Sequence, residues 1–254
     1  MQSVQEGWCN AKALVPARTR RWLRLRLRRL LLRPPVGHIR FGGLRRVTPI
    51  SRAFHERGQS VDRYYIENFL ATHVQDIQGR VLEVADDTYT QQFGRTRVTK
   101  SDILSVGEGN PQATIVADLS RADSIPSAIF DCIILTQTLQ YIYDTRAALR
   151  HLYRILKPRG ILLVTCPGIA HISRADMERW GDYWRFTARS AQRLCEEVFP
   201  ARNVEVHAHG NVLIAVAYLH GMATEELTQE ELDFSDPDYQ VLVTIRAVKP
   251  EAAL

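Results

Sequence analysis

Acidic side chains stand near the ends of several predicted strands, where they could bind a ligand. Glu83 lies near the end of an apolar run, and Asp118 directly follows another. Asp102 lies near the end of a weaker strand between them. In an open α/β sheet, the ligand lies across the carboxyl ends of the strands. Carboxylates there suit a nucleoside-like ligand with ribose hydroxyls, an amine and a positive centre, because they accept from donors and attract cations.

The same strand ends suit a pyrophosphate poorly. A pyrophosphate needs backbone N–H donors from a glycine-rich turn at a helix N-terminus. After the first predicted strand the chain reads Glu83-Val84-Ala85-Asp86-Asp87, without a glycine. A nicotinamide dehydrogenase is therefore not indicated, since the GxGxxG turn is missing.

Strand and helix patterns alternate from residue 61 to residue 248. The predicted strands cover residues 81–85, 97–99, 114–117, 129–136, 161–165, 204–207 and 241–248. Helical spacing of apolar residues predicts helices over residues 61–74, 144–156, 187–198 and 211–222. This alternation predicts an α/β fold with a doubly wound, mostly parallel seven-stranded sheet and helices on both faces.

Charge divides the chain into two parts. Residues 1–46 carry a net charge of +11, whereas the remainder carries −6. We therefore predict a basic N-terminal arm and connector over 1–46 and one ligand-binding domain over 47–254. Within the arm, Arg18–Arg33 alternates arginine and leucine and is followed by two prolines. This segment could be a solvated or packed helix, or it could lie on an anionic membrane surface. Nucleic acid phosphates are the third and least favoured interpretation, and nucleic acid is not expected as a partner because the body is acidic.

The cysteines and apolar runs exclude several protein classes. The four cysteines lie far apart without CxxC spacing, so neither a disulfide framework nor a metal site is indicated. Cys132 and Cys166 fall in apolar runs and are expected to be buried and unreactive. No apolar run approaches the roughly 18–20 residues that span a bilayer, and the N-terminus lacks a secretory signal. We expect a cytoplasmic protein, with peripheral membrane contact through Arg18–Arg33 as an open alternative.

One stretch of the sequence resembles a known family. From Phe130-Asp131 through the turn Leu156-Lys157-Pro158-Arg159-Gly160, the sequence is similar to the second half of the S-adenosylmethionine-dependent small-molecule methyltransferase domain. The resemblance covers residues 79–199, and the run 184–187 (Trp-Arg-Phe-Thr) also resembles a helix opening of that family. It implies the class I, Rossmann-like methyltransferase fold with S-adenosyl-L-methionine as cofactor. The implied reaction is methyl transfer to an O or N atom of a small molecule or glycan intermediate.

The resemblance also implies roles for the residues at the strand ends. Glu83 matches the acid near the methionine end of the cofactor, and Asp102 matches the acid that accepts from the ribose hydroxyls. Asp118 and Leu119 match the pair that borders the adenine ring. The short stretch between Asp102 and Asp118 leaves little room for the usual helix. The full implied cofactor set is Glu83, Ala85, Asp86, Asp87, Asp102, Asp118, Leu119 and Thr136.

The loop after Glu83 departs from the glycine-rich family pattern. Because aspartate tolerates the left-handed region better than most residues, Asp86 or Asp87 is expected to replace a glycine there. Gly94 is a second candidate for close approach to the cofactor. Asp86 and Asp87 are also expected to face its ammonium and sulfonium groups. The alternative is a catalytically silent, methyltransferase-like module that supports a partner protein.

The loop after the fifth strand is expected to overhang the methyl acceptor. His171 in this loop is the candidate general base, although methyl transfer from a sulfonium can run largely on positioning and desolvation. Before the first strand, Arg63 and Tyr64 are candidate cofactor contacts. Asp131 and Asp144 are interpreted as a strand anchor and a helix N-cap. The sequence indicates neither the identity of the acceptor nor the oligomeric state.

Overall fold

The computed structural model of the protein describes residues 42–52 and 56–251. From Thr48 onward the chain forms one compact unit. A 3₁₀ turn, η1 (Gly42–Leu44), precedes that unit in the chain. Arg18–Arg33 and Cys9 lie outside the described residues, and the predictions that rest on them remain predictions.

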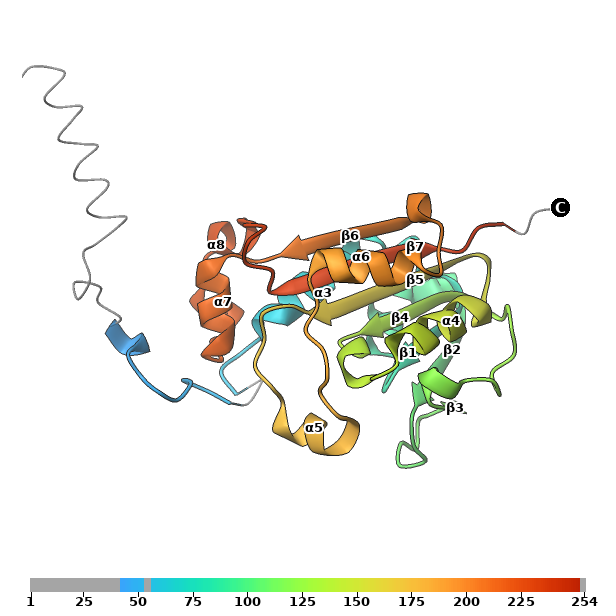
Figure 1. Ribbon diagram of the computed structural model, residues 1–254, viewed down its shortest axis with the longest axis horizontal. Coiled ribbons are helices and arrows are strands. Elements are labelled where there is room, and N and C mark those ends of the chain that lie inside the picture. Colours follow the sequence, from blue (N-terminus) through green and yellow to red (C-terminus); the bar gives the residue numbers. More distant parts are fainter. Residues whose placement is uncertain (1–41, 53–55, 252–254) are drawn as a thin grey trace, which may run out of the picture. The chain divides into compact units, whose positions relative to one another are not determined.

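A seven-stranded sheet forms the centre of the compact unit, in the order β3-β2-β1-β4-β5-β7-β6 (Figure 1). The strands are β1 (Gly79–Val84), β2 (Val98–Ser105), β3 (Ile115–Val116), β4 (Phe130–Thr136), β5 (Leu156–Pro167), β6 (Val204–His209) and β7 (Leu242–Val248). All pairs among β1 to β5 are parallel, whereas β7 runs antiparallel to both β5 and β6. The predicted mostly parallel, seven-stranded sheet is confirmed.

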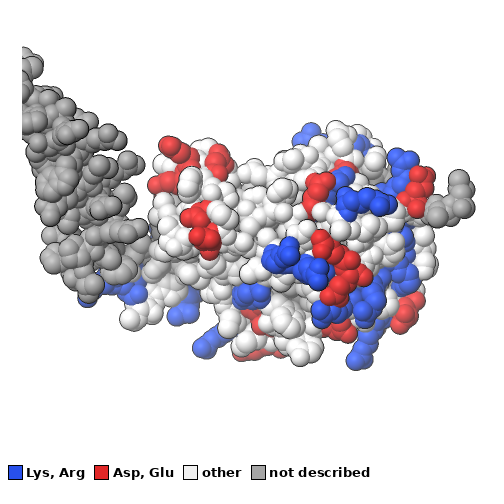
Figure 2. All heavy atoms as spheres, turned by 45° about the horizontal axis from the view of Figure 1, so that its top comes forward, with Lys and Arg blue, Asp and Glu red and all other residues white. Residues whose placement is uncertain are grey.

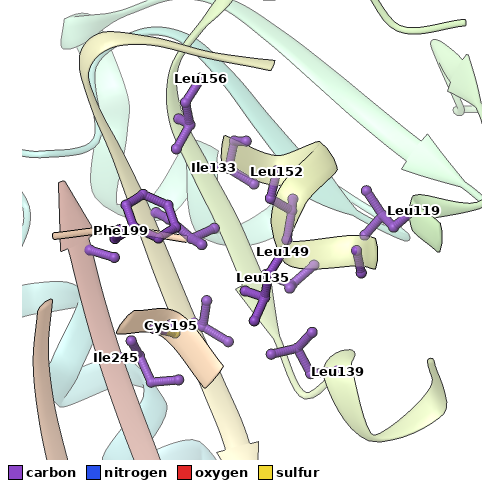
Figure 3. Packing of buried hydrophobic residues seen from close by; sticks show 14 of the residues in the cluster. Leu119, Ile133, Leu135, Leu139, Leu149, Leu152, Leu156, Cys195, Phe199 and Ile245 are labelled. Carbon is purple, nitrogen blue, oxygen red and sulfur yellow. The ribbon is translucent and has the colours of Figure 1, made fainter. Parts of the chain in front are cut away.

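Helices cover both faces of the sheet, as predicted. On one face, α3 (Val61–Thr72) and α7 (Val212–Leu219) share a buried cluster with β1. On the other face, α4 (Thr145–Ile155) and α6 (Ala188–Glu196) pack on β4 and β7. Figure 3 shows Leu149 and Leu152 of α4 and Cys195 of α6 in the second cluster. Two short helices that the sequence analysis did not predict lie in connections, α5 (Arg174–Trp180) and α8 (Gln229–Asp233).

Strand β2 is longer than predicted. It runs to Ser105, although the sequence indicated a strand only at residues 97–99. Residues 99–102 are all polar, which hides the apolar signal of a buried strand. The connection from β2 to β3 contains no helix, as predicted from the short spacing.

The two aspartates interpreted as structural have structural contacts. Asp144 accepts a hydrogen bond from the backbone N of Ala147 at 2.9 Å and caps α4. Asp131 accepts from the backbone N of Arg80 at 2.7 Å and from Lys157 Nζ at 2.8 Å, which ties β4 to the start of β1. Gly79 is required beside it, because a Cβ there would lie 2.4 Å from the Asp131 carboxylate.

The cysteine prediction is also confirmed. Cys132 on β4 and Cys166 on β5 are fully buried. Burial raises the pKa of both thiols above the ordinary value, so neither is ionised near neutral pH.

Candidate active site

The loop after β1 contains a residue in a conformation that favours glycine. Ala85 has φ +75°, in the left-handed region. Its backbone N donates to the carbonyl of Leu104 at 2.9 Å, and its own carbonyl accepts from Asn110 Nδ2 at 2.6 Å. The prediction that Asp86 or Asp87 takes this conformation is wrong. The sheet fixes the turn at the first residue after β1, and alanine carries the smallest side chain that could stand there.

Glu83 holds the far end of this loop. Its side chain is only 2% exposed. It accepts hydrogen bonds from the backbone N of Tyr89 at 3.2 Å, and from the backbone N and the Oγ1 of Thr90, both at 2.7 Å. Burial raises the pKa of Glu83 to about 7, although these three donors oppose the rise. Glu83 therefore fixes the loop from β1 into the next helical turn.

The two loop aspartates point to different neighbours. Asp86 is exposed and accepts from the backbone N of Thr88 at 2.9 Å. Asp87 accepts from Gln91 Nε2 at 2.7 Å and from Ser101 Oγ at 3.0 Å. Ser101 lies in the middle of β2, so the Asp87 carboxylate points back along the sheet and away from the strand ends. The structure therefore does not bring the two carboxylates together.

Gly94 makes its close approach within the protein core. A Cβ at Gly94 would lie 2.3 Å from Val98 Cγ2 and 3.0 Å from Ile77 Cγ2. The expectation that Gly94 replaces the missing loop glycine is therefore wrong, because packing against these two side chains explains it.

Asp102 was predicted near the end of its strand, but it lies in the middle of β2. Its side chain is 2% exposed, and it pairs with Arg80 Nε at 2.6 Å and Lys100 Nζ at 3.4 Å. Burial alone would raise the pKa of Asp102, but the contact with Arg80, helped by Lys100, holds it below the ordinary value. The contacts of Asp102 are those of an internal ion pair. The end of β2 is occupied by Ser105, which the sequence analysis did not select.

Asp118 and Thr136 lie where the sequence predicted, at strand ends. Asp118 is exposed, and it accepts from the backbone N and the Oγ of Ser120, both at 2.8 Å. Thr136 is the last residue of β4. Leu119 was predicted to border the adenine ring, but its side chain is only 3% exposed and packs in the core that α4 covers (Figure 3).

A buried polar cluster lies at the ends of β4 and β5, and the sequence analysis did not identify it. Asp62, at the start of α3, is 6% exposed and accepts from Ser60 Oγ at 2.5 Å and from Gln137 Nε2 at 3.4 Å. Gln137 follows Thr136 with φ +44°. Gln140 donates through Nε2 to the Gln137 carbonyl at 2.9 Å, and its buried Oε1 has no hydrogen-bond partner among the described residues.

Of the two candidate contacts on α3, only Arg63 reaches the loop after β1. Arg63 Nη1 donates to the hydroxyl of Tyr89 at 2.5 Å. Burial would lower the pKa of Arg63, but the influence of Tyr89 and the Asp62 charge raise it above the ordinary value, so the guanidinium remains a cation. The hydroxyl of Tyr64 instead donates to Asp233 Oδ1 at 2.5 Å, which directs it toward α8.

His171 lies in the loop that follows β5, at the surface. Its ring centroid is 6.2 Å from that of Tyr218, and its carbonyl accepts from Arg185 Nη2 at 2.7 Å. Desolvation, followed by the charge of Arg185, lowers the pKa of His171 below the ordinary value. The imidazole is therefore neutral at pH 7 and able to accept a proton. It borders a hollow of about 10 Å³ that Ser60 and Tyr218 also line, room for one water molecule.

Within the described ranges 42–52 and 56–251, no cluster of three or more His, Cys, Asp or Glu side chains is arranged to bind a metal ion. No helix in the same ranges is long and apolar enough to cross a membrane.

A family profile and several solved structures match this chain. The profile of a methyltransferase domain family matches residues 59–211, more than half of the chain. No curated protein matches significantly. Among solved structures, phosphoethanolamine N-methyltransferase 2 from Haemonchus contortus, in complex with S-adenosyl-L-methionine, matches with a TM-score of 0.50 and 17% identity. That match covers 83% of this chain and 55% of the other, so the chain spans about half the length of that enzyme.

A second similar structure is a SAM-dependent methyltransferase from Archaeoglobus fulgidus, with a TM-score of 0.49, 14% identity, and coverage of 74% of this chain and 94% of the other. At 17% identity, the match to the Haemonchus contortus enzyme shows only the fold, while the profile establishes the family. The chain belongs to the class I S-adenosylmethionine-dependent methyltransferases.

Proposed function

We propose that this methyltransferase methylates an O or N atom of a small molecule or glycan intermediate. The observation that carries the proposal is the loop after β1. Ala85 adopts the left-handed conformation at a loop where the family has glycines, and Glu83 accepts hydrogen bonds that fix the far end of the loop. Ala85 is exposed and carries only a methyl group, so the backbone of this turn stays open to a ligand much as it would with glycine.

The residues at the strand ends fit the cofactor. We assign the methionine end to Glu83, Ala85 and Asp86, the adenine border to Asp118, and the adjoining end of β4 to Thr136. Asp86 and Asp118 are exposed carboxylates that suit a cationic ligand with amine and hydroxyl donors. When bound, the cofactor supplies a methyl group on a sulfonium centre. Asp87, Asp102 and Leu119 support the site from within the fold.

The methyl acceptor is assigned to the surface at the carboxyl ends of β4 and β5. There the Asp62 carboxylate and the Gln137 amide provide an acceptor and a donor for a hydroxyl or amine. His171, neutral at pH 7, is the candidate to take up the proton that a hydroxyl loses as it attacks, or that an ammonium group loses to become the attacking amine.

Calorimetric titration with S-adenosyl-L-methionine and S-adenosylhomocysteine tests the cofactor site. Both ligands should bind the wild-type protein, and Asp118→Ala should weaken both by roughly threefold to tenfold, since one exposed hydrogen-bonded carboxylate is worth about 1 kcal/mol. Asp123→Ala, which removes an exposed acid a few residues later, serves as the matched control and should bind normally. No heat with either ligand at millimolar concentration would favour the catalytically silent module.

The basic arm suggests where the enzyme works. We propose a cytoplasmic enzyme that contacts an anionic membrane surface through Arg18–Arg33, because eight arginines alternate there with leucines. Nucleic acid is not proposed as a partner, because the charge outside the arm is −6.

A further inference from the structure

Large apolar side chains lie exposed on the segment that follows His171 and on Tyr143. The segment covers residues 172–184 and includes α5. Their exposed fractions are 71% for Tyr143, 58% for Ile172, 52% for Tyr183, 45% for Met177 and Trp180, and 38% for Trp184. Single exposed apolar residues are ordinary, but a group of them marks a binding surface. Figure 1 shows α5 on a connection that projects from the sheet.

Three of the aromatic rings are held in fixed positions. Trp184 Nε1 donates to the Ile142 carbonyl at 3.1 Å, and its ring stacks on that of Tyr143 with centroids 5.8 Å apart and planes at 28°. The Tyr183 ring meets Tyr143 edge-on at 5.3 Å. Gly181, with φ +77°, leaves room for the Tyr183 ring, because a Cβ there would lie 2.2 Å from it. The three rings therefore pack on one another into one platform, and part of each ring stays exposed.

Polar groups of both kinds lie in the same segment. Asp182 is only 2% exposed and is bonded within the fold, where it accepts from Arg185 Nη1 at 2.5 Å and from the backbone N of Ser173 at 3.2 Å. Asp176 accepts from the hydroxyl of Tyr141 at 3.1 Å. Residues 172–185 contain three arginines and three acids, so the segment has no net charge. A neutral platform offers no attraction to an anionic bilayer or a polyanion.

We propose that Tyr143, Tyr183 and Trp184 form a carbohydrate-binding platform that holds a neutral sugar chain of the acceptor. The C–H faces of a sugar ring carry partial positive charge and pack on the negative faces of aromatic rings. The sugar hydroxyls need both donors and acceptors, which the exposed side chains of Arg174, Glu178 and Arg179 on α5 supply. This inference rests on the proposed function, since it identifies the acceptor class of the same site.

The size of the neighbouring hollow supports an acceptor that lies on the surface. Ligands of drug size bind in cavities of about 300–1,000 Å³. The hollow beside His171 holds only about 10 Å³. This hollow is too small for a sugar ring, so a sugar chain bound near His171 would have to lie on the outer surface, where the rings are.

A printed array of bacterial, plant and mammalian glycans, probed with the full-length protein, tests the platform. The wild type should bind at least one class of neutral glycan, and titration of that glycan should change the tryptophan emission. Tyr143→Ala and Tyr183→Ala each remove one ring and should weaken binding roughly threefold to tenfold. Phe234→Ala and Tyr239→Ala remove exposed rings elsewhere and should bind as the wild type does.

Three results would overturn the platform. In the first, the wild type binds no glycan on the array. In the second, the platform and control variants lose glycan binding to the same extent. In the third, the wild type binds phosphatidylcholine vesicles and Tyr183→Ala abolishes that binding. The last result would assign the rings to a bilayer. Titration of each variant with S-adenosyl-L-methionine separates the two proposals, because cofactor binding should be unchanged in all four variants even where glycan binding fails.

Discussion

The buried carboxylate of Glu83 should make the stability of the protein fall as pH rises. Burial raises the pKa of Glu83 from its ordinary 4.5 to about 7. The folded state therefore binds this proton more tightly than the unfolded state does. The resulting stability is complete below about pH 4.5 and is lost as pH rises through about 7, and its full size is about 3 kcal/mol.

Replacing the carboxyl group isolates this contribution. Glu83→Gln keeps the shape of the side chain and cannot ionise, so it should lack this loss of stability. Urea unfolding at pH 5 and pH 8 gives the free energy of unfolding for the wild type and the variant. Between these pH values the wild type should lose about 2 kcal/mol more than Glu83→Gln, because part of the effect already lies below pH 5.

An exposed glutamate provides the control for other titrating groups. Glu108→Gln, in the loop after β2, should follow the wild type. If Glu83→Gln and the wild type lose stability in parallel, burial does not raise the pKa of the Glu83 carboxyl group and the reasoning is refuted.

Three further outcomes follow from the site. Asp102→Asn should lower the free energy of unfolding by about 2 kcal/mol, because it breaks the ion pair with Arg80, and should leave affinity for S-adenosyl-L-methionine unchanged in calorimetry; a loss of affinity alone would restore its role at the ribose. Asp86→Ala should weaken the binding of S-adenosyl-L-methionine more than the binding of adenosine, whereas Asp87→Ala should lower the melting temperature because it removes the contacts with Gln91 and Ser101; the reverse pattern would exchange their roles. Deletion of residues 1–33 should reduce sedimentation with anionic vesicles in a salt-dependent manner and leave cofactor affinity intact; unchanged sedimentation would exclude the arm as the membrane contact.

The sequence predicted those elements whose side chains follow one clear pattern. The apolar run of β4 and the helical spacing of α4 were predicted to within two residues. Strand β2 was cut short because Thr99 to Asp102 are polar. Only Asp102 among them is buried, and its burial depends on a partner, Arg80, from another strand. The short helix α5 has no buried residue and so left no periodic signal.

The candidate site was predicted only in part, for a related reason. Local order along a strand was enough to select Glu83, Asp118 and Thr136. The cluster of Asp62 and Gln137 joins residues far apart in the chain, and the fold alone brings them together. Likewise, the left-handed backbone of Ala85 follows from the register of β1 with β2 and not from the type of residue.

The position of β7 has a consequence for synthesis of the chain. Although it comes last among the strands, β7 lies between β5 and β6 and supplies the neighbour of each. Until residues 242–248 have left the ribosome, β5 has an unpaired edge formed by an apolar strand, which is a template for aggregation. We therefore expect nascent chains that stop before β7 to require chaperone protection, and C-terminal truncation within this strand to yield insoluble protein.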